Sequence, residues 1–387
     1  MSIFLNNADW NVPIPILYGP NRILELATLC KSHNIKRPLI VTDKGSRQLP
    51  FISIITKLLN VAGLKISIFS EISPNPLDRE ILLGKSIYRD GKHDGIIAIG
   101  GGSGMDGGKA ISLIVNNEYS LWDFDNDKLE VKGLENFSPL ICIPTTSGTG
   151  AETHSTAMVT DTDLGIKKCV WYPSHRPLAA ILDPELTFDL PKSLTAWTGV
   201  DALVHAVESY SINSLDPVAD GMAVEGLNLI GEYIEKVIAS PYDVESRGGM
   251  LIGSCLAGIS FTKGLGLVHA VSHMVGAVYD TQHGLTNAII LPAVLRFNED
   301  SIRHKVKVMN FSTFRDNGNF DSFYLNICNL LDRLEIPVGL SSIGVKKEKV
   351  SELALKASKD AAASTNPRYA TIDALQTLIL ESLEGAR

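Results

Sequence analysis

The residues best suited to chemistry are histidines and an aspartate that recur at helical spacing in the second half of the chain. Asp201 and His205 are four residues apart, His269 and His273 repeat that interval, and His283 follows a predicted turn. Residues four apart lie on one face of a helix, about one turn from each other. Burying so many polar side chains is costly unless something pairs them, as a divalent cation would. We therefore predict a metal site, and the alternative is a set of core histidines with ordinary hydrogen bonds.

The ligand types narrow the choice of metal. Imidazole nitrogens with one carboxylate suit iron(II), zinc, cobalt or nickel, and the absence of a thiolate from the set argues against the softest ions. An aspartate with three histidines could leave one coordination position open for a substrate oxygen. That arrangement is typical of a Lewis-acid site and not of a closed structural one.

A glycine-rich segment in the first half has the pattern of a strand, a tight turn and a helix start. It reads IAIGGGSGMDGGKA over residues 97–110. Glycines let the backbone come close to a ligand, and a helix N-terminus offers free N–H groups to an anion such as a pyrophosphate. Gly102, Gly104 and Gly107 formally match the dinucleotide fingerprint, but they lie late in the domain and not at its first βα turn. A tight turn that merely needs glycine is the alternative.

Two further features bear on a nucleotide site. The hydroxyls of the segment Pro144–Gly150, which follows another predicted strand, could line a nucleotide or simply form a polar surface loop. Asp43 ends the first predicted strand. A carboxylate there can bond a ribose 2′-hydroxyl and would repel a 2′-phosphate, although a single aspartate more often caps a turn.

The elements that must position these residues fall into two regions. Short Ile/Val-rich strands are predicted over 38–43, 64–69, 94–99 and 139–143, and amphipathic helices over 20–31, 49–62, 77–88 and 106–115. Helical periodicity then dominates over 194–210, 219–238, 246–258, 266–278, 284–297, 350–359 and 372–383. We predict a Rossmann-like α/β domain with a parallel sheet over residues 1–185, followed by an all-helical metal-binding domain over 186–387.

Composition excludes several function classes. The 387 residues are 45% apolar and 20% charged, which is typical of a globular protein and not of a disordered one. A net charge of −8 does not suit nucleic acid or an anionic membrane. Five scattered cysteines without a CxxC pair indicate free thiols in a reducing, cytoplasmic setting. Neither a membrane span nor a signal peptide is expected. His33, His93, His154, His175 and His304 are interpreted as solvated surface residues.

Six motifs in order make the chain resemble the iron-activated (group III) alcohol dehydrogenases over nearly its whole length. They are Ile99–Asp106, Pro144–Glu152, Asp183–Leu186, Gly199–His205, Gly264–His269 and His283–Pro292. The resemblance implies an N-terminal dinucleotide-binding domain and a helical C-terminal metal domain. It also implies NAD(P) with a divalent metal, usually iron(II), between the domains, and a homo-oligomer, commonly a dimer.

Site residues carried over from the resemblance form two groups. The metal ligands would be Asp201, His205, His269 and His283, whereas His273 would be an additional, catalytic histidine near the nicotinamide. The cofactor-binding residues would be Asp43, Asn75, Gly101, Gly102, Ser103, Asp106, Thr145, Thr146, Thr149 and Lys167. Lys168 is an alternative to Lys167, and Asp43 matches the acidic residue associated with preferring NAD over NADP.

The expected reaction is the reversible, NAD-linked oxidation of a small primary alcohol to its aldehyde. A similarity in residues 38–47, 217–221 and 261–266 points toward ω-hydroxy acids such as 4-hydroxybutyrate. Three alternatives stay open: a lyase of the dehydroquinate-synthase type that recycles NAD, an enzyme like maleylacetate reductase, and a non-catalytic nucleotide-binding protein.

Overall fold

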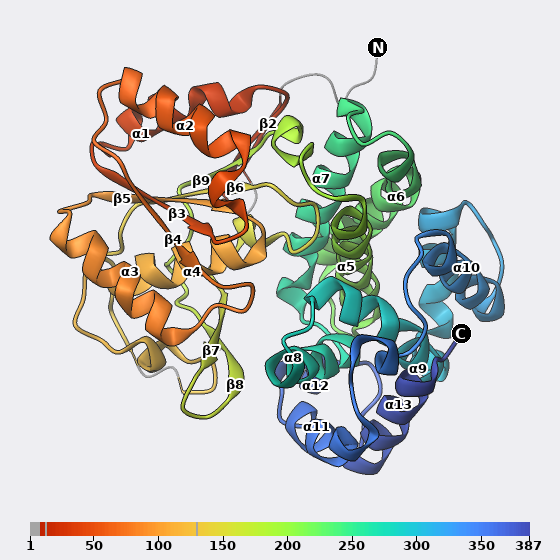
Figure 1. Ribbon diagram of the computed structural model, residues 1–387. Helices are drawn as coiled ribbons and strands as arrows, with labels where there is room; N and C mark the ends of the chain where they lie inside the picture. Colours follow the sequence, from red (N-terminus) through yellow and green to blue (C-terminus); the bar gives the residue numbers. More distant parts are fainter. Residues whose placement is uncertain (1–7, 12–13, 129–130) are drawn as a thin grey trace. The chain divides into compact units, whose positions relative to one another are not determined.

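The computed structural model describes residues 8–11, 14–128 and 131–387 (Figure 1). The N-terminal segment read for a signal peptide therefore lies partly outside the described residues. The chain divides into two compact units, Met1–Thr146 with Ala151–Leu190 and Ser147–Gly150 with Pro191–Arg387. The domain boundary expected after residue 185 stays a prediction.

A mainly parallel sheet forms the centre of the first unit. Within the described residues seven strands pair in the order β1 (Ala8–Asn11), β2 (Pro15–Tyr18), β9 (Ala179–Leu182), β6 (Leu140–Pro144), β5 (Gly95–Gly100), β3 (Pro38–Asp43) and β4 (Ser67–Ile72). Only the pairing of β1 with β2 is antiparallel in this sheet. The predicted parallel sheet is confirmed. The strand predicted over 64–69 lies three residues later, because the amide of Leu64 bonds the carbonyl of Leu59 and closes the preceding helix.

Helices cover both faces of this sheet (Figure 1). They are α1 (Leu26–Ser32), α2 (Pro50–Val61), α3 (Asp78–Asp90) and α4 (Gly102–Ile114). Alternate residues of each strand face opposite ways, so Ile40 packs in the core with α1 and α2 while Leu39 packs in the core with α3 and α4. Helix α4 lies very close to the sheet, since a Cβ at Gly108 would be 2.4 Å from the Cβ of Ala98.

A two-stranded antiparallel ribbon was missed by the sequence analysis. It consists of β7 (Ala157–Asp161) and β8 (Ile166–Val170), with Thr160 opposite Lys167. The signal was present but short: alternating residues flank a turn that ends at Gly165, whose φ is 62°.

The second unit is helical, as predicted. Its helices are α5 (Lys192–Ser211), α6 (Pro217–Ala239), α7 (Val244–Ser260), α8 (Leu267–Tyr279), α9 (His283–Phe314), α10 (Phe320–Arg333), α11 (Val350–Ala357), α12 (Ala361–Thr365) and α13 (Ile372–Glu384). Helix α5 is buried over most of its length and packs against α6, α7 and α9. Helix α9 continues well past the predicted end at residue 297, because Ile302, Val306 and Met309 extend its buried face.

Two expectations about individual residues need correction. His93 and His175 are buried, not solvated, and the Nε2 atom of His175 lies 3.0 Å from the hydroxyl of Ser112. Helix α10 was not predicted, although Phe320, Phe323 and Ile327 recur at helical spacing on its buried face.

The cysteines are free, as predicted. Among the described residues no single helix is long and apolar enough to cross a membrane, and one bent pair, Val244–Lys263 with Leu267–Tyr279, passes by length and composition alone.

Candidate active site

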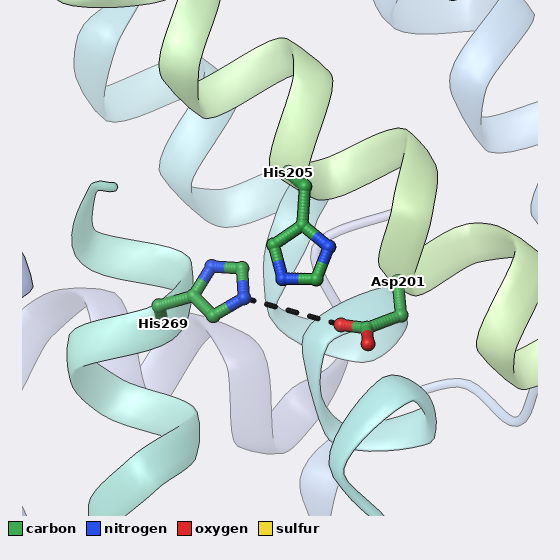
Figure 2. Close-up of side chains that lie close together, drawn as sticks. All are labelled: Asp201, His205 and His269. Atoms are coloured by element: carbon green, nitrogen blue, oxygen red, sulfur yellow. Dashed lines mark ion pairs between the residues drawn. The ribbon is translucent and has the colours of Figure 1, made fainter. Parts of the chain in front are cut away.

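Three helices of the second unit carry the predicted metal ligands. Helix α5 carries Asp201 and His205, α8 carries His269 and His273, and His283 is the first residue of α9. Asp201, His205 and His269 are buried, and one potential ligand atom from each lies within 4.8 Å of the others. The three side chains point toward one another from α5 and α8 (Figure 2).

The electron-pair donors of this cluster converge on one point. The Nε2 atom of His269 lies 3.9 Å from Oδ1 of Asp201, and that of His283 lies 3.7 Å from the same oxygen. The side-chain nitrogen of Asn287 marks the point of convergence, at 2.6 Å from Asp201 Oδ1, 3.2 Å from His269 Nε2 and 3.1 Å from His283 Nε2. Sequence analysis missed Asn287, which follows His283 by one helical turn.

His205 completes the cluster from the other side. Its ring stacks on that of His269 with centroids 4.6 Å apart, and Phe261 packs at 5.0 Å. The Nδ1 atom of His205 is buried without a hydrogen-bond partner among the described residues. A buried nitrogen without a partner is costly, so the ring of His205 is not fully satisfied by the protein.

A buried glutamate fixes the orientation of His269. The Nδ1–H of His269 donates to Glu208 at 2.6 Å, and the same carboxylate accepts the amides of Gly266 at 3.0 Å and Val268 at 2.7 Å. The Nε2 lone pair of His269 is therefore directed toward Asp201. Histidine ligands of metals commonly donate their second N–H to a carboxylate in this way.

Burial sets the protonation of both groups. Burial, with the nearby His205, lowers the pKa of His269 well below its usual value, although Asp201 opposes the shift. Burial also raises the pKa of Glu208 to about 7, against the hydrogen bonds from Gly266 and Val268 that lower it. A neutral imidazole is the form that binds a metal. The donor set of one carboxylate and three imidazoles thus fits iron(II) or zinc.

His273 lies beside this cluster and has its own carboxylate partner. Its ring stacks on that of His283 with centroids 5.5 Å apart and an interplanar angle of 10°. Its Nδ1 lies 2.9 Å from Oδ2 of Asp360, whose other oxygen accepts the amide of Ala362 at the start of α12. Burial raises the pKa of Asp360, but His273, the amide of Ala362 and His269 together outweigh it and the net shift is downward. Sequence analysis did not identify Asp360, which lies 87 residues from its partner.

In the first unit the glycine turn leads directly into a helix, as predicted. Gly100 has a φ of 138°, Gly101 is the N-cap and α4 begins at Gly102. Asp43 lies against this turn, because a Cβ at Gly100 would be 2.7 Å from Oδ2 of Asp43. The Asp43 carboxylate accepts the amide and the hydroxyl of Ser46, at 2.9 and 2.7 Å, so it also caps the turn that follows β3.

Other predicted cofactor residues of the first unit are linked to one another. The hydroxyl of Ser103 donates to the carbonyl of Pro74 at 2.5 Å, and the ammonium of Lys167 lies 3.2 Å from Oδ1 of Asn75. The neighbouring Lys168 instead pairs with Asp125 and Asp161, at 3.3 and 3.0 Å. The two lysines therefore differ in their partners, since Lys168 is held by two carboxylates and Lys167 contacts the amide side chain of Asn75.

The remaining predicted cofactor residues are distributed over both units. Thr145 and Thr146 follow β6 in the first unit, and a Cβ at Gly101 would lie 3.3 Å from Cγ2 of Thr146. Thr149 belongs to the second unit. Asp106, on the first turns of α4, is engaged by protein partners: Lys109 at 3.2 Å and the amide of Met158 at 3.2 Å.

Comparisons with known proteins agree with this architecture. Residues 13–184 match the family model described as iron-containing alcohol dehydrogenase, and residues 195–383 match that of the Fe-containing alcohol dehydrogenase family, C-terminal. The chain is 34% identical over 380 residues to the NAD-dependent methanol dehydrogenase of Bacillus methanolicus, covering 96% of this chain and 99% of that protein.

Solved structures give the same result. A structure of 1,3-propanediol oxidoreductase superposes with a TM-score of 0.91 at 30% identity, over 98% of this chain and 100% of that one. The sulfoacetaldehyde reductase of Bifidobacterium kashiwanohense, solved in complex with NAD+, superposes with a TM-score of 0.85 at 26% identity, over 98% of each chain.

Proposed function

The chain belongs to the iron-containing alcohol dehydrogenase family, and from that premise we propose that it interconverts short, uncharged primary alcohols and their aldehydes. The family resemblance inferred from the sequence is confirmed. The protein is an NAD-dependent alcohol dehydrogenase with NAD and a divalent metal, iron(II) in this family, as cofactors. The observation that carries the proposal is the convergence of buried Asp201 and His269 and partly buried His283 on one point.

Asp201, His205, His269 and His283 are the proposed metal ligands. When bound, the metal would supply Lewis acidity toward the alcohol oxygen, and NAD would supply a hydride acceptor. Glu208 holds His269 in the tautomer that has its lone pair on Nε2. Asn287 donates to Asp201 and so fixes the direction of that carboxylate.

His273 is the proposed proton carrier. Because Asp360 accepts a hydrogen bond from Nδ1 of His273, the proton of the neutral ring resides on Nδ1 and Nε2 is left as the acceptor. The role of Asp360 is therefore to set the tautomer and the ring plane.

In the first unit the proposed cofactor residues bind and orient the dinucleotide. The free N–H groups at the start of α4 suit a pyrophosphate, and Asp43 beside the turn favours NAD, because a carboxylate would repel a 2′-phosphate. Asn75, Gly101, Gly102, Ser103, Thr145, Thr146, Thr149 and Lys167 are proposed to contact the cofactor.

The preference for an uncharged alcohol is supported by Lys263. This lysine lies in one of the segments that resemble enzymes acting on ω-hydroxy acids, and a substrate carboxylate would need a cation. Its side chain is only 1% exposed and its ammonium is paired with Asp220 at 2.5 Å. The charge of Lys263 is therefore already neutralised by Asp220 and does not serve a substrate carboxylate. The second candidate substrate, which the assay must test, is 4-hydroxybutyrate.

The test is NADH absorbance with anaerobically purified protein, NAD and a panel of short alcohols, diols and hydroxy acids, with iron(II), zinc or no added metal. We expect turnover that depends on one metal and a higher kcat/KM for 1-butanol than for 4-hydroxybutyrate. A ratio that favours 4-hydroxybutyrate by tenfold or more would overturn the substrate class. NAD binding without net NADH formation on any substrate would favour the lyase.

By family resemblance we also propose a homodimer. Light scattering after size-exclusion chromatography tests this, and a mass near 41.9 kDa would contradict it. A cytoplasmic location is a further proposal, supported by the free thiols.

A further inference from the structure

Lys109 is a fully buried lysine that the proposed reaction does not use. It lies on α4, about two turns after the first residue of that helix, and its side chain is 0% exposed. Its ammonium donates to the carbonyl of Ala151 at 2.9 Å and to the carbonyl of Thr156, and it pairs with Asp106 at 3.2 Å. Three acceptors match the three N–H bonds of an ammonium, so the buried charge is fully satisfied.

Asp106 connects the same helix to the β7–β8 ribbon. One carboxylate oxygen pairs with Lys109 and the other accepts the amide of Met158 on β7. Lys109 holds the residues that lead into β7, and Asp106 holds the strand itself. We call this pair the Asp106–Lys109 clamp.

The ribbon that the clamp holds carries a proposed cofactor residue. Lys167 on β8 lies opposite Thr160 on β7, and its ammonium contacts Asn75 at 3.2 Å. The amide of Thr160 in turn donates to the carbonyl of Pro76 at 2.7 Å. The clamp, the ribbon and the 74–76 turn thus form one continuous set of contacts within the first unit.

We propose that the Asp106–Lys109 clamp positions the β7–β8 ribbon, and with it Lys167, for binding the dinucleotide, and that Asp106 acts through this clamp and not by touching the cofactor. The proposal rests on the dinucleotide site put forward above. It departs from the family resemblance, which implies that Asp106 contacts the cofactor. Both Asp106 oxygens are occupied by protein donors, and its side chain is only 16% exposed.

A double-mutant cycle tests the clamp. NADH affinity is measured by fluorescence for the wild type, Asp106→Asn, Lys109→Met and the double variant, with KM for NAD and kcat measured in parallel. We expect each single variant to weaken NADH binding at least about tenfold, since binding sites lose affinity when their groups are no longer held in place. The double variant should bind NADH no more weakly than the worse single variant does, because both substitutions disrupt the same Asp106–Lys109 clamp. Metal content should be unchanged.

The conservative Asp106→Asn variant keeps the proposal testable if Lys109→Met fails to fold, because an amide oxygen can still accept the Met158 N–H. Lys85→Met is the matched control: Lys85 also bonds a carbonyl, that of Asn117 at 3.3 Å, but lies on α3. It should bind NADH as the wild type does. Hydrogen exchange of the β7 amides should be faster in both clamp variants even without cofactor.

Different outcomes separate the clamp from the site it serves. If Asp106→Asn weakens binding and Lys109→Met does not, Asp106 contacts the cofactor and the clamp proposal is wrong. If folded variants melt at a lower temperature but bind NADH within twofold of the wild type, the clamp serves stability alone. If the wild type itself does not bind NADH, the dinucleotide site is wrong, and the β7 exchange rates still test whether the clamp holds the ribbon.

Discussion

Two buried polar clusters in this molecule differ in whether the protein itself supplies all of their hydrogen-bond partners. In the first unit the ammonium of Lys109 faces three acceptors of the protein and is fully paired. In the second unit three acceptor atoms, from Asp201, His269 and His283, converge on the side-chain nitrogen of Asn287, which has only two N–H bonds to offer, and the Nδ1 atom of His205 has no partner among the described residues. A satisfied cluster serves architecture, whereas convergent lone pairs favour a cation. Satisfaction of hydrogen bonds, more than burial, therefore distinguishes the two roles.

Removing one of the convergent side chains of the second unit should have the largest effect on activity. His269→Ala should abolish metal binding and lower kcat by at least about a thousandfold, because the metal supplies the Lewis acidity of the reaction. Metal content by mass spectrometry and NADH formation are measured together. His304→Ala, which changes a histidine on the distal half of α9, is the control and should retain both. Full activity in His269→Ala would remove this residue from the ligand set.

A smaller effect is expected from the carboxylate that supports the ligand. Glu208→Gln should weaken metal binding roughly 10- to 100-fold, which is the usual loss when a partner behind a metal ligand is changed. Competition with a metal chelator measures the affinity directly. Glu225→Gln, on the neighbouring helix α6, is the matched control. Unchanged metal affinity in Glu208→Gln would mean that Glu208 serves only to hold the start of α8.

A buried histidine near Lys109 can be probed through pH. Burial, with the charge of Lys109 as a second cause, lowers the pKa of His175 from 6.5 to about 3. The unfolded chain therefore binds a proton below pH 6.5 that the folded chain does not, so stability falls as the pH is lowered. Between pH 7 and pH 5 the loss should be about 2 kcal/mol.

Urea unfolding at the two pH values measures that loss. His175→Gln, which cannot titrate, should lose about 2 kcal/mol less than the wild type over the same interval. His33→Gln, at the exposed end of α1, should keep the full pH dependence. Equal pH dependence in the wild type and His175→Gln would show that His175 is protonated in the folded protein.

The smallest effect concerns the partner of His273. Asp360→Asn should lower kcat about tenfold at constant metal content, because an amide cannot hold the imidazole in one tautomer as a carboxylate does. KM for the alcohol should change little. Asp373→Asn, at the start of α13, is the control. A loss of metal together with activity would instead assign Asp360 to the stability of the metal site.

Much of the site could be predicted from local patterns. Helical spacing places Asp201 beside His205, and His269 beside His273. One short segment was enough to predict the glycine turn and the helix after it. Residues whose partners are distant in sequence could not be predicted in the same way. Asp360 lies 87 residues from His273, and Lys109 lies 42 residues from Ala151. The β7–β8 ribbon was missed because its strands are short and its pattern is weak.

The sequence by itself determined the parallel sheet, the helical second unit, the metal-binding residue types and the family. These depend on periodicity and on ordered motifs, which are properties of neighbouring residues. Only the tertiary structure decided that Glu208 holds His269, that Asn287 lies where the lone pairs converge, and that Asp106 is bound to Lys109 and the amide of Met158. A side-chain hydrogen bond depends on directions and distances of a few tenths of an ångström, and these are fixed only when whole elements pack.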